Sequence, residues 1–238
     1  MATDDDPSAG PLSVAAEDHL KEIYKATEWG ADGVSTSELA RALGTTPASV
    51  SDMVKRLGVR GLVDHRPYRP VRLTDAGRTA AVRVVRRHRL LETFLVAELG
   101  YTWDEVHDEA EALEHWVSER LVARLDARLG HPAVDPHGDP IPRADGSVDA
   151  QHGLVTPGEA EVGEYVVARL SDDDPGLLVY CAERGLTPGT RVRLVGREPA
   201  AGTVTLAVDG AEVVLGGGPA DAVHLRPVGD EGTSTPAR

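Results

Sequence analysis

Residues 36–61 read TSELARALGTTPASVSDMVKRLGVRG and contain two short helical patterns separated by a glycine turn. In the first pattern the apolar residues recur at helical spacing, and Thr36 and Ser37 are candidate N-caps. In the second, Pro47 follows Thr46 at a first-turn position, where a missing N–H is tolerated. Helix, tight turn and second helix are the order of a helix-turn-helix.

The flanking segments complete a winged DNA-binding module. A helix is predicted over 13–29, and residues 62–73 indicate a hairpin with a Pro-rich tip, followed by a long helix over 75–99. In a winged helix-turn-helix the second helix enters the major groove and the hairpin touches backbone or minor groove. The candidate DNA contacts are Ser37, Thr46, Pro47, Ser49, Ser51, Asp52, Lys55, Arg56 and Arg69.

Charge is unevenly distributed along the chain. The net charge of −14 by itself argues against a nucleic-acid partner. Between Thr36 and Leu90, however, the chain has 12 Lys/Arg and only 4 Asp/Glu, whereas the rest of the chain has 13 basic and 35 acidic residues. Residues 91–119 hold nine acids and no Lys or Arg. We expect a phosphate-binding segment followed by one that gathers carboxylates, and the alternative is that both are solvated faces.

Length and composition bound the class of protein. A chain of 238 residues predicts two or three compact units, and 41% hydrophobic with 27% charged residues is typical of soluble globular proteins. No apolar run approaches the ~20 residues that cross a bilayer. The N-terminal MATDDDPSAG lacks the apolar stretch of a secretory signal, and Cys181 is the one cysteine. We therefore expect a cytoplasmic protein without an intramolecular disulfide or a membrane partner.

Histidines and carboxylates recur along a helix predicted over 102–129. Four of them, at i, i+4, i+7 and i+8, would fall on one stripe: His107, Glu111, Glu114 and His115. His88 and Glu92 are four residues apart on the preceding helix. Carboxylates that approach one another repel unless a cation neutralises them, which favours a divalent metal, whereas a lone pair of this kind is usually a solvated face. The apolar residues of the later helix, including Leu121 and Leu125, pack either a dimer or the domain core.

The last third of the chain changes to a period of two. Residues 131–157 are rich in Pro and Gly and indicate a connector. Asp209-Gly210 is a strong two-residue hairpin pattern. Short alternating strands are predicted at 191–195, 203–208, 211–215 and 223–228, which together indicate a small β-barrel.

Five motifs in order resemble the diphtheria toxin repressor family of metal-dependent transcriptional regulators. They are AEDHLKEIY, the winged helix, RRHRLLE, VHDEAEALEH and HPAVDPHGDPIP, with the small β-barrel after them. The resemblance covers nearly the whole chain and implies a mainly α fold with a small β part, a homodimer, a double-stranded DNA operator and no enzymatic activity. The implied parts are a disordered N-terminus 1–12, a winged helix-turn-helix domain 13–78, a helical dimerisation and metal domain with connector 79–148, an SH3-like (FeoA-like) domain 149–228 and a disordered tail 229–238.

The resemblance also implies two metal sites per subunit. The primary ligands would be Asp18, Glu111, Glu114 and His115. In the iron-responsive branch the first two positions are methionine and cysteine. Two carboxylates there resemble the manganese-responsive branch instead, and oxygen ligands suit Mn²⁺. The secondary ligands would be His88, Glu92, His107, Asp135, His137 and Asp172, with Asp173 or Asp174 as alternatives to Asp172.

Lys21 departs from the family pattern. Manganese regulators without the C-terminal domain have a glutamate at this position, so the lysine favours two separated sites over their binuclear arrangement. The expected function is repression of metal-uptake genes, in which Mn²⁺ orders the dimer so that its recognition helices lie one DNA turn, roughly 34 Å, apart. The alternatives are an Fe²⁺-dependent regulator of iron uptake and, more distantly, a metallohydrolase, for which no nucleophile or base constellation is present.

Overall fold

A computed structural model describes residues 10–28, 32–66, 69–149, 151–172 and 174–228 of the chain. Two compact units are formed. The first contains the residues up to 88 together with 114–117 and 142–147, and the second contains 89–113, 118–141 and the residues from 148 onward. Within the described residues, no helix is both long and apolar enough to cross a membrane.

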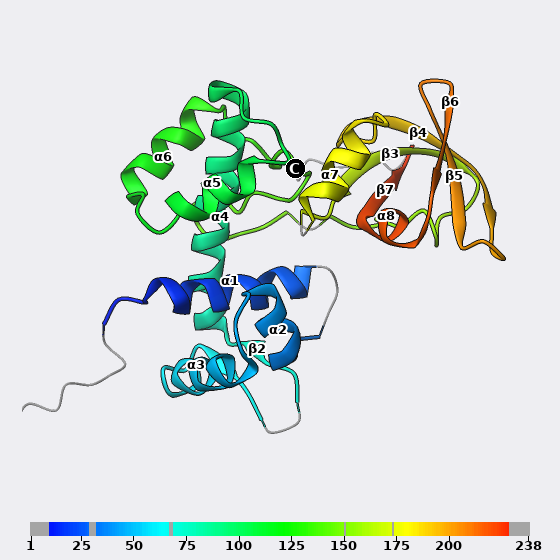
Figure 1. The fold of residues 1–238 in the computed structure, drawn as a ribbon. Coiled ribbons are helices and arrows are strands. Elements are labelled where there is room, and N and C mark those ends of the chain that lie inside the picture. Colours follow the sequence, from blue (N-terminus) through cyan, green and yellow to red (C-terminus); the bar gives the residue numbers. More distant parts are fainter. Residues whose placement is uncertain (1–9, 29–31, 67–68, 150, 173, 229–238) are drawn as a thin grey trace, which may run out of the picture. The chain divides into compact units, whose positions relative to one another are not determined.

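The first unit is a winged helix-turn-helix. Its elements are α1 (Val14–Glu28), α2 (Thr36–Ala42), α3 (Pro47–Val59), β1 (Val63–Asp64), β2 (Arg72–Leu73) and the first half of α4 (Asp75–Leu99) (Figure 1). β1 and β2 pair in antiparallel fashion, as the hairpin pattern predicts. Apolar side chains of the three short helices form one core, which includes Leu20, Leu39 and Val54. Of the predicted wing tip, residues 67–68 lie outside the described residues.

The start of α2 differs from the prediction. Ser35 is the N-cap, rather than Thr36 or Ser37. The Ser35 hydroxyl accepts from the Glu38 backbone N–H, and the Glu38 carboxylate accepts from the Ser35 backbone N–H. This reciprocal capping box satisfies two N–H groups that the helix itself leaves without partners, which neither alternative offers.

The single helix predicted over 102–129 is wrong. The chain forms α5 (Val106–Leu113), a turn at 114–116, and α6 (Glu119–Arg128). Ser118 caps α6, because its hydroxyl accepts from the Leu121 backbone N–H at 3.3 Å. A serine at this position offers the backbone an alternative to continuing the helix. Glu114 and His115 therefore lie in a turn and do not continue the helical stripe of His107.

The C-terminal part of the second unit is a five-stranded antiparallel sheet of order β6-β5-β4-β3-β7. Its strands are β3 (Gly163–Leu170), β4 (Arg191–Glu198), β5 (Thr203–Val208), β6 (Ala211–Leu215) and β7 (Val223–Pro227), and its helices are α7 (Pro175–Ala182) and α8 (Gly217–Ala222) (Figure 1). The four predicted strands are confirmed, whereas β3 and both helices were not predicted. Asp209 and Gly210 have φ of 48° and 84°, as a two-residue hairpin turn requires.

The connector contacts the β3 strand directly. Leu170 donates its backbone N–H to the His137 carbonyl at 2.9 Å. A Cβ added to Gly138, whose φ is +89°, would lie 2.1 Å from the Ala168 carbonyl oxygen. The backbones of the connector and of β3 approach so closely that only glycine fits at this point.

Candidate metal centres and nucleic-acid interface

The first group of candidate ligands lies in the first unit, on α1 and in the turn after α5. Asp18, Glu114 and His115 each offer a ligand atom within 4.8 Å of the others. His115 Nε2 is 2.8 Å from Asp18 Oδ1 and 3.2 Å from Glu114 Oε1. Two carboxylates and one imidazole nitrogen around a common point are donors that fit a divalent ion such as Mn²⁺.

Glu17 orients His115, a role that the sequence reasoning missed. Glu17 Oε2 lies 2.7 Å from His115 Nδ1 and accepts from Arg87 Nη2 at 2.9 Å. A carboxylate only accepts hydrogen bonds, so Glu17 favours a proton on Nδ1, and Nε2, on the side of Asp18 and Glu114, is the nitrogen that a metal ion would bind. This is how a carboxylate holds a metal-binding histidine in position. The one available indication was that Glu17 precedes Asp18 in the chain.

Glu114 is fully buried, and its two oxygens have different partners. Oε1 accepts from Lys21 Nζ at 2.7 Å, and Oε2 lies 2.7 Å from His88 Nδ1. Burial disfavours the charged form, but the hydrogen bond and charge of His88 and the Lys21 ammonium outweigh it and lower the pKa of Glu114. Glu114 is therefore a carboxylate at neutral pH. Lys21 supplies a buried cation that no local pattern indicated.

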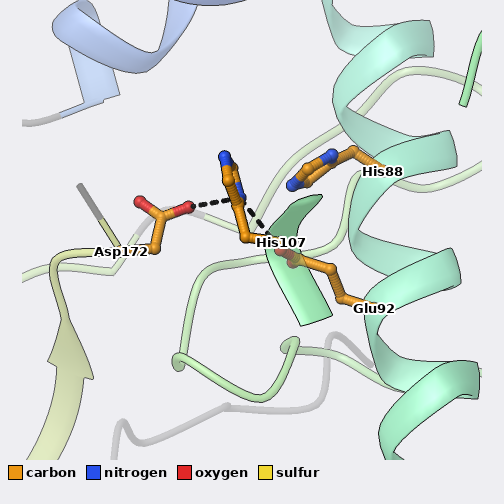
Figure 2. A group of neighbouring side chains, drawn as sticks. All are labelled: His88, Glu92, His107 and Asp172. Atoms are coloured by element: carbon orange, nitrogen blue, oxygen red, sulfur yellow. Dashed lines mark hydrogen bonds and ion pairs between the residues drawn. The ribbon is translucent and has the colours of Figure 1, made fainter. Parts of the chain in front are cut away.

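The second group lies in the second unit, on α4, on α5 and just after β3. Glu92, His107 and Asp172 each offer a ligand atom within 4.8 Å of the others. His107 Nδ1 is 3.3 Å from Glu92 Oε1 and 3.6 Å from Asp172 Oδ2 (Figure 2). His88, a predicted secondary ligand, lies one helical turn before Glu92 on α4, and its Nδ1 contacts Glu114 as described above.

Asp135 of the connector is buried and already bonded. Its Oδ1 accepts the backbone N–H groups of His137 and Asp139, each at 2.9 Å, and its Oδ2 is 3.5 Å from Arg89 Nε. Burial, and then the carboxylates of Asp139 and Glu92, raise the pKa of Asp135 to about 8. This buried carboxyl therefore holds a proton more tightly than an exposed aspartate does.

His137 is fully buried beside Asp135. Its Nε2 is 2.7 Å from the Trp103 carbonyl oxygen, and Glu92, Asp135 and His137 offer ligand atoms within 4.8 Å of one another. Burial disfavours the imidazolium, but the negative charges of Glu92, Asp135 and Asp172 outweigh this effect and raise the pKa of His137. Negative potential therefore converges on this imidazole.

Three further acidic residues belong to the predicted sets. Glu111 Oε1 lies 3.6 Å from His107 Nε2. Asp174 is the N-cap of α7. Asp173 lies outside the described residues. Of the two alternatives that the structure describes, Asp172 and Asp174, Asp172 lies in a group with histidine and carboxylate.

The candidate DNA-contacting residues lie on α2, α3 and the hairpin of the first unit. Thr46 caps α3, because its hydroxyl accepts from the Ser49 backbone N–H at 3.2 Å. The Ser51 hydroxyl donates to the Pro47 carbonyl at 2.8 Å, and Ser51 is half-buried. The exposed members of the predicted set are Ser37, Thr46, Pro47, Ser49, Asp52, Lys55, Arg56 and Arg69.

Three family models match the chain. Residues 11–71 match the iron dependent repressor N-terminal DNA binding domain, residues 74–143 the iron dependent repressor metal binding and dimerisation domain, and residues 158–227 the FeoA domain. These matches support DNA and a second copy of the chain as partners. They also set aside the metallohydrolase alternative, because the family consists of DNA-binding repressors and not of enzymes.

Relatives extend over most of the chain. The iron-dependent repressor IdeR of Mycobacterium leprae is 34% identical over an alignment of 213 residues, and the match covers 83% of this chain and 90% of that protein. The diphtheria toxin repressor of Corynebacterium glutamicum is 30% identical and covers 89% of this chain and 96% of its own. A solved manganese-dependent transcriptional repressor in complex with manganese is 49% identical, with a TM-score of 0.85, and covers 90% of this chain and 100% of its own. The chain belongs to the diphtheria toxin repressor family of metal-dependent transcriptional repressors.

Proposed function

We propose that Mn²⁺ is the co-repressor of this protein and that it binds Asp18, Glu114 and His115. With Mn²⁺ bound, the dimer binds the operator DNA of metal-uptake genes in the cytoplasm and represses them. Glu111 is a further proposed ligand of this primary site. The observation that carries the proposal is the convergence of His115 Nε2 on Asp18 and Glu114, at 2.8 and 3.2 Å.

The choice of metal rests on the donor atoms. Oxygen and imidazole nitrogen suit Mn²⁺, and the described residues of the group contain no sulfur, which would favour softer ions. The similarity to a manganese-dependent repressor supports the same choice. Iron is the second candidate, because the family models and the mycobacterial relative carry iron in their descriptions.

The coupling to DNA follows from which segments the ion would join. Asp18 lies on α1, which packs into the core of the DNA-binding unit, whereas Glu114 and His115 lie between α5 and α6 in the chain. An ion held by all three would fix α1 against that turn. Metal and operator would then strengthen each other's binding by linkage.

The test of the primary site uses Asp18→Asn. The DNA is a duplex selected by the wild-type protein from a random library with Mn²⁺ present. We expect the substitution to abolish most of the Mn²⁺-dependent gain in DNA affinity, because it removes one charged ligand. Asp126→Asn is the matched control, since Asp126 also pairs with a histidine, His131, at 2.9 Å. If Asp18→Asn kept the full metal dependence, the primary site would be rejected.

The same assay, run anaerobically with Mn²⁺ or Fe²⁺ at buffered free concentrations, decides between the two metals. We expect Mn²⁺ to activate DNA binding in the range of free Mn²⁺ found in cells, and Fe²⁺ to fail at its own cellular level. Activation by Fe²⁺ alone under those conditions would favour the iron-responsive alternative.

The proposed DNA interface is tested through its dependence on salt. Arg56→Ala should weaken binding to all sequences and reduce the slope of log K against log salt by about 1, as expected for one lost phosphate contact. Arg184→Ala, just after α7 in the second unit, is the control and should leave the slope unchanged. An unchanged slope for Arg56→Ala would remove this residue from the interface.

A further inference from the structure

The first unit has an apolar groove with a basic rim between the start of α1 and the second half of α3. The groove has a volume of about 330 Å³, and its apolar lining includes Met53 and Val59. Val59 is 75% exposed, so this apolar surface is open to solvent. Three cations line the same groove, Lys55, Arg56 and Arg60. A groove of this kind suits a segment of chain that carries carboxylates.

The cations of the rim have little negative charge opposite them. Lys55 Nζ is 3.3 Å from Asp52 Oδ1, but both side chains are 73% exposed, so this ion pair is weak. No ion pair joins Arg56 or Arg60 to a carboxylate in the part of the chain that the structure describes. The rim therefore offers positive charge to an anion that comes from elsewhere.

An acidic segment of the chain begins beside this rim. Arg60 Nη2 donates to the carbonyl of Gly10, the first described residue. The nine residues before Gly10 read MATDDDPSA and lie outside the described residues. They contain three consecutive aspartates, Asp4, Asp5 and Asp6. The match to the family's DNA-binding domain begins at residue 11, so these aspartates precede it.

The length of chain between the aspartates and Gly10 allows them to reach the rim. Asp6 precedes Gly10 by four residues, which span at most about 14 Å when extended. Arg56 lies roughly 6 Å, or about one helical turn, before Arg60 along α3. Carboxylates that are tethered at Gly10 can therefore approach both guanidinium groups.

We propose that residues 1–9 bind in this groove when DNA is absent, and that their aspartates pair with Lys55, Arg56 and Arg60. The segment then competes with DNA phosphates for cations of α3. Because phosphates are common to all DNA, the segment weakens binding to every sequence by the same factor. This inference rests on the proposed function in that Lys55 and Arg56 belong to the proposed DNA interface, and it is independent of the choice of metal.

The experiment compares full-length wild-type protein with D4N/D5N/D6N. Fluorescence anisotropy measures the affinity for the duplex selected above and for a scrambled duplex. We expect D4N/D5N/D6N to bind both about three- to tenfold more tightly at low salt, the range that up to three weak surface ion pairs allow. The gain should shrink as salt is raised, because salt screens the competing carboxylates.

The matched control removes the same amount of negative charge from exposed glutamates of the second unit, Glu161→Gln, Glu164→Gln and Glu212→Gln together. The chain does not tether these side chains beside α3, so both DNA affinities should stay close to those of the wild type. An equal gain in the control and in D4N/D5N/D6N would overturn the inference, because the gain would then reflect net charge alone.

Arg60→Ala tests the attachment of the segment, because it removes the donor to the Gly10 carbonyl. In this background, neutralising the three aspartates should tighten DNA binding less than it does in the wild type. An undiminished gain would contradict binding in the groove.

The scrambled duplex with chelator separates this inference from the metal proposal. If Mn²⁺ were not the co-repressor, every protein would lack a Mn²⁺ response, but the comparison of wild type with D4N/D5N/D6N would be unaffected. If only the inference were wrong, wild type and D4N/D5N/D6N would bind DNA equally and both would still respond to Mn²⁺.

Discussion

In the group around Asp18 a lysine ammonium lies 2.7 Å from Glu114, whereas in the group around Glu92 the nearest nitrogens of the predicted ligands belong to imidazoles. The first group therefore contains a permanent cation. In the second group the imidazoles of His107 and His137 face Glu92, and the only guanidinium among these contacts, that of Arg89, lies farther from its carboxylate, 3.5 Å from Asp135. Both gather buried carboxylates, but they balance that charge by different means.

The difference bears on how each group responds to metal. At an effective dielectric constant of 20, two unit charges 4 Å apart interact by about 4 kcal/mol, so an ion near Glu114 must overcome repulsion from Lys21 or displace its ammonium. In the second group Arg89 lies 3.5 Å from Asp135, and an ion bound there would also have to compete with protons on Asp135 and His137, both of which have raised pKa values. We infer that the first group is tuned by a side chain and the second by pH.

Of the substitutions that test this difference between the two groups, Lys21→Ala should have the largest effect on stability. Removing one partner of a buried ion pair leaves Glu114 without its ammonium, and we expect the metal-free protein to lose about 3–5 kcal/mol of stability. Mn²⁺ should restore part of this loss, because it replaces the missing positive charge. Urea denaturation with chelator and with Mn²⁺ measures both quantities.

The control for this variant is Arg128→Ala, which breaks a surface pair with Glu98 and should cost less than about 1 kcal/mol in either condition. If Lys21→Ala lost equal stability with and without Mn²⁺, the ammonium and the metal would not act on the same carboxylate.

Gly138→Ala tests the second group by separating the connector from β3. The new Cβ would meet the Ala168 carbonyl oxygen at 2.1 Å, and the residue keeps a φ of +89°, so we expect a loss of about 2–5 kcal/mol. Metal binding by the second group should weaken while the primary ion is retained. Urea denaturation and metal counting give the two readouts. Gly216→Ala, where a Cβ meets nothing within 4 Å, is the matched control.

Asp135→Asn tests the role of protons in the second group. The pKa of Asp135 is raised to about 8, so the folded metal-free protein holds this proton more tightly than the unfolded chain, whose carboxyl has a pKa near 3.8. Its contribution to stability is therefore fully present below about pH 4 and is lost as the pH rises to about 8.

We expect wild-type protein to lose on the order of 1–3 kcal/mol more than Asp135→Asn between pH 5 and pH 8. Urea denaturation of both proteins with chelator at each pH measures the difference. The asparagine oxygen can still accept the two backbone N–H groups, so the variant should fold. Parallel pH profiles for the two proteins would contradict the raised pKa.

Ser118→Ala should have the smallest effect. It removes the hydroxyl that accepts from the Leu121 backbone N–H at the start of α6, which typically costs about 1 kcal/mol. Because the turn that carries Glu114 and His115 ends at this cap, Mn²⁺ affinity of the primary site should fall slightly, and that of the second group should not change. Calorimetric titration distinguishes the two. Equal weakening at both would show that the cap does not act through the turn.

Much of the fold was predictable because it is encoded locally. Apolar spacing placed α1, α3 and α4 to within a few residues, and Asp209-Gly210 located the β5–β6 turn. β3 was missed because Val166 and Ala168 on its second face are also apolar, which weakens a period-two pattern.

The ligand chemistry was predictable only in part. Asp18, Glu114 and His115 were all named from the sequence, and the structure brings their ligand atoms together. The family resemblance grouped these three residues. The helical stripe, which joined Glu114 and His115 to His107 and Glu111, is wrong, because Glu114 and His115 lie in a turn.

The sequence by itself determined the helix-turn-helix, the hairpins and the strand pattern, because each depends on neighbours a few residues apart. It also determined which oxygen and imidazole donors are present. Tertiary structure alone decided that Lys21 neutralises Glu114 across 93 residues of chain, and that Glu17 orients His115 across 98. Such pairs depend on where distant segments pack. The charge balance of a buried site is set by that packing, which local periodicity does not encode.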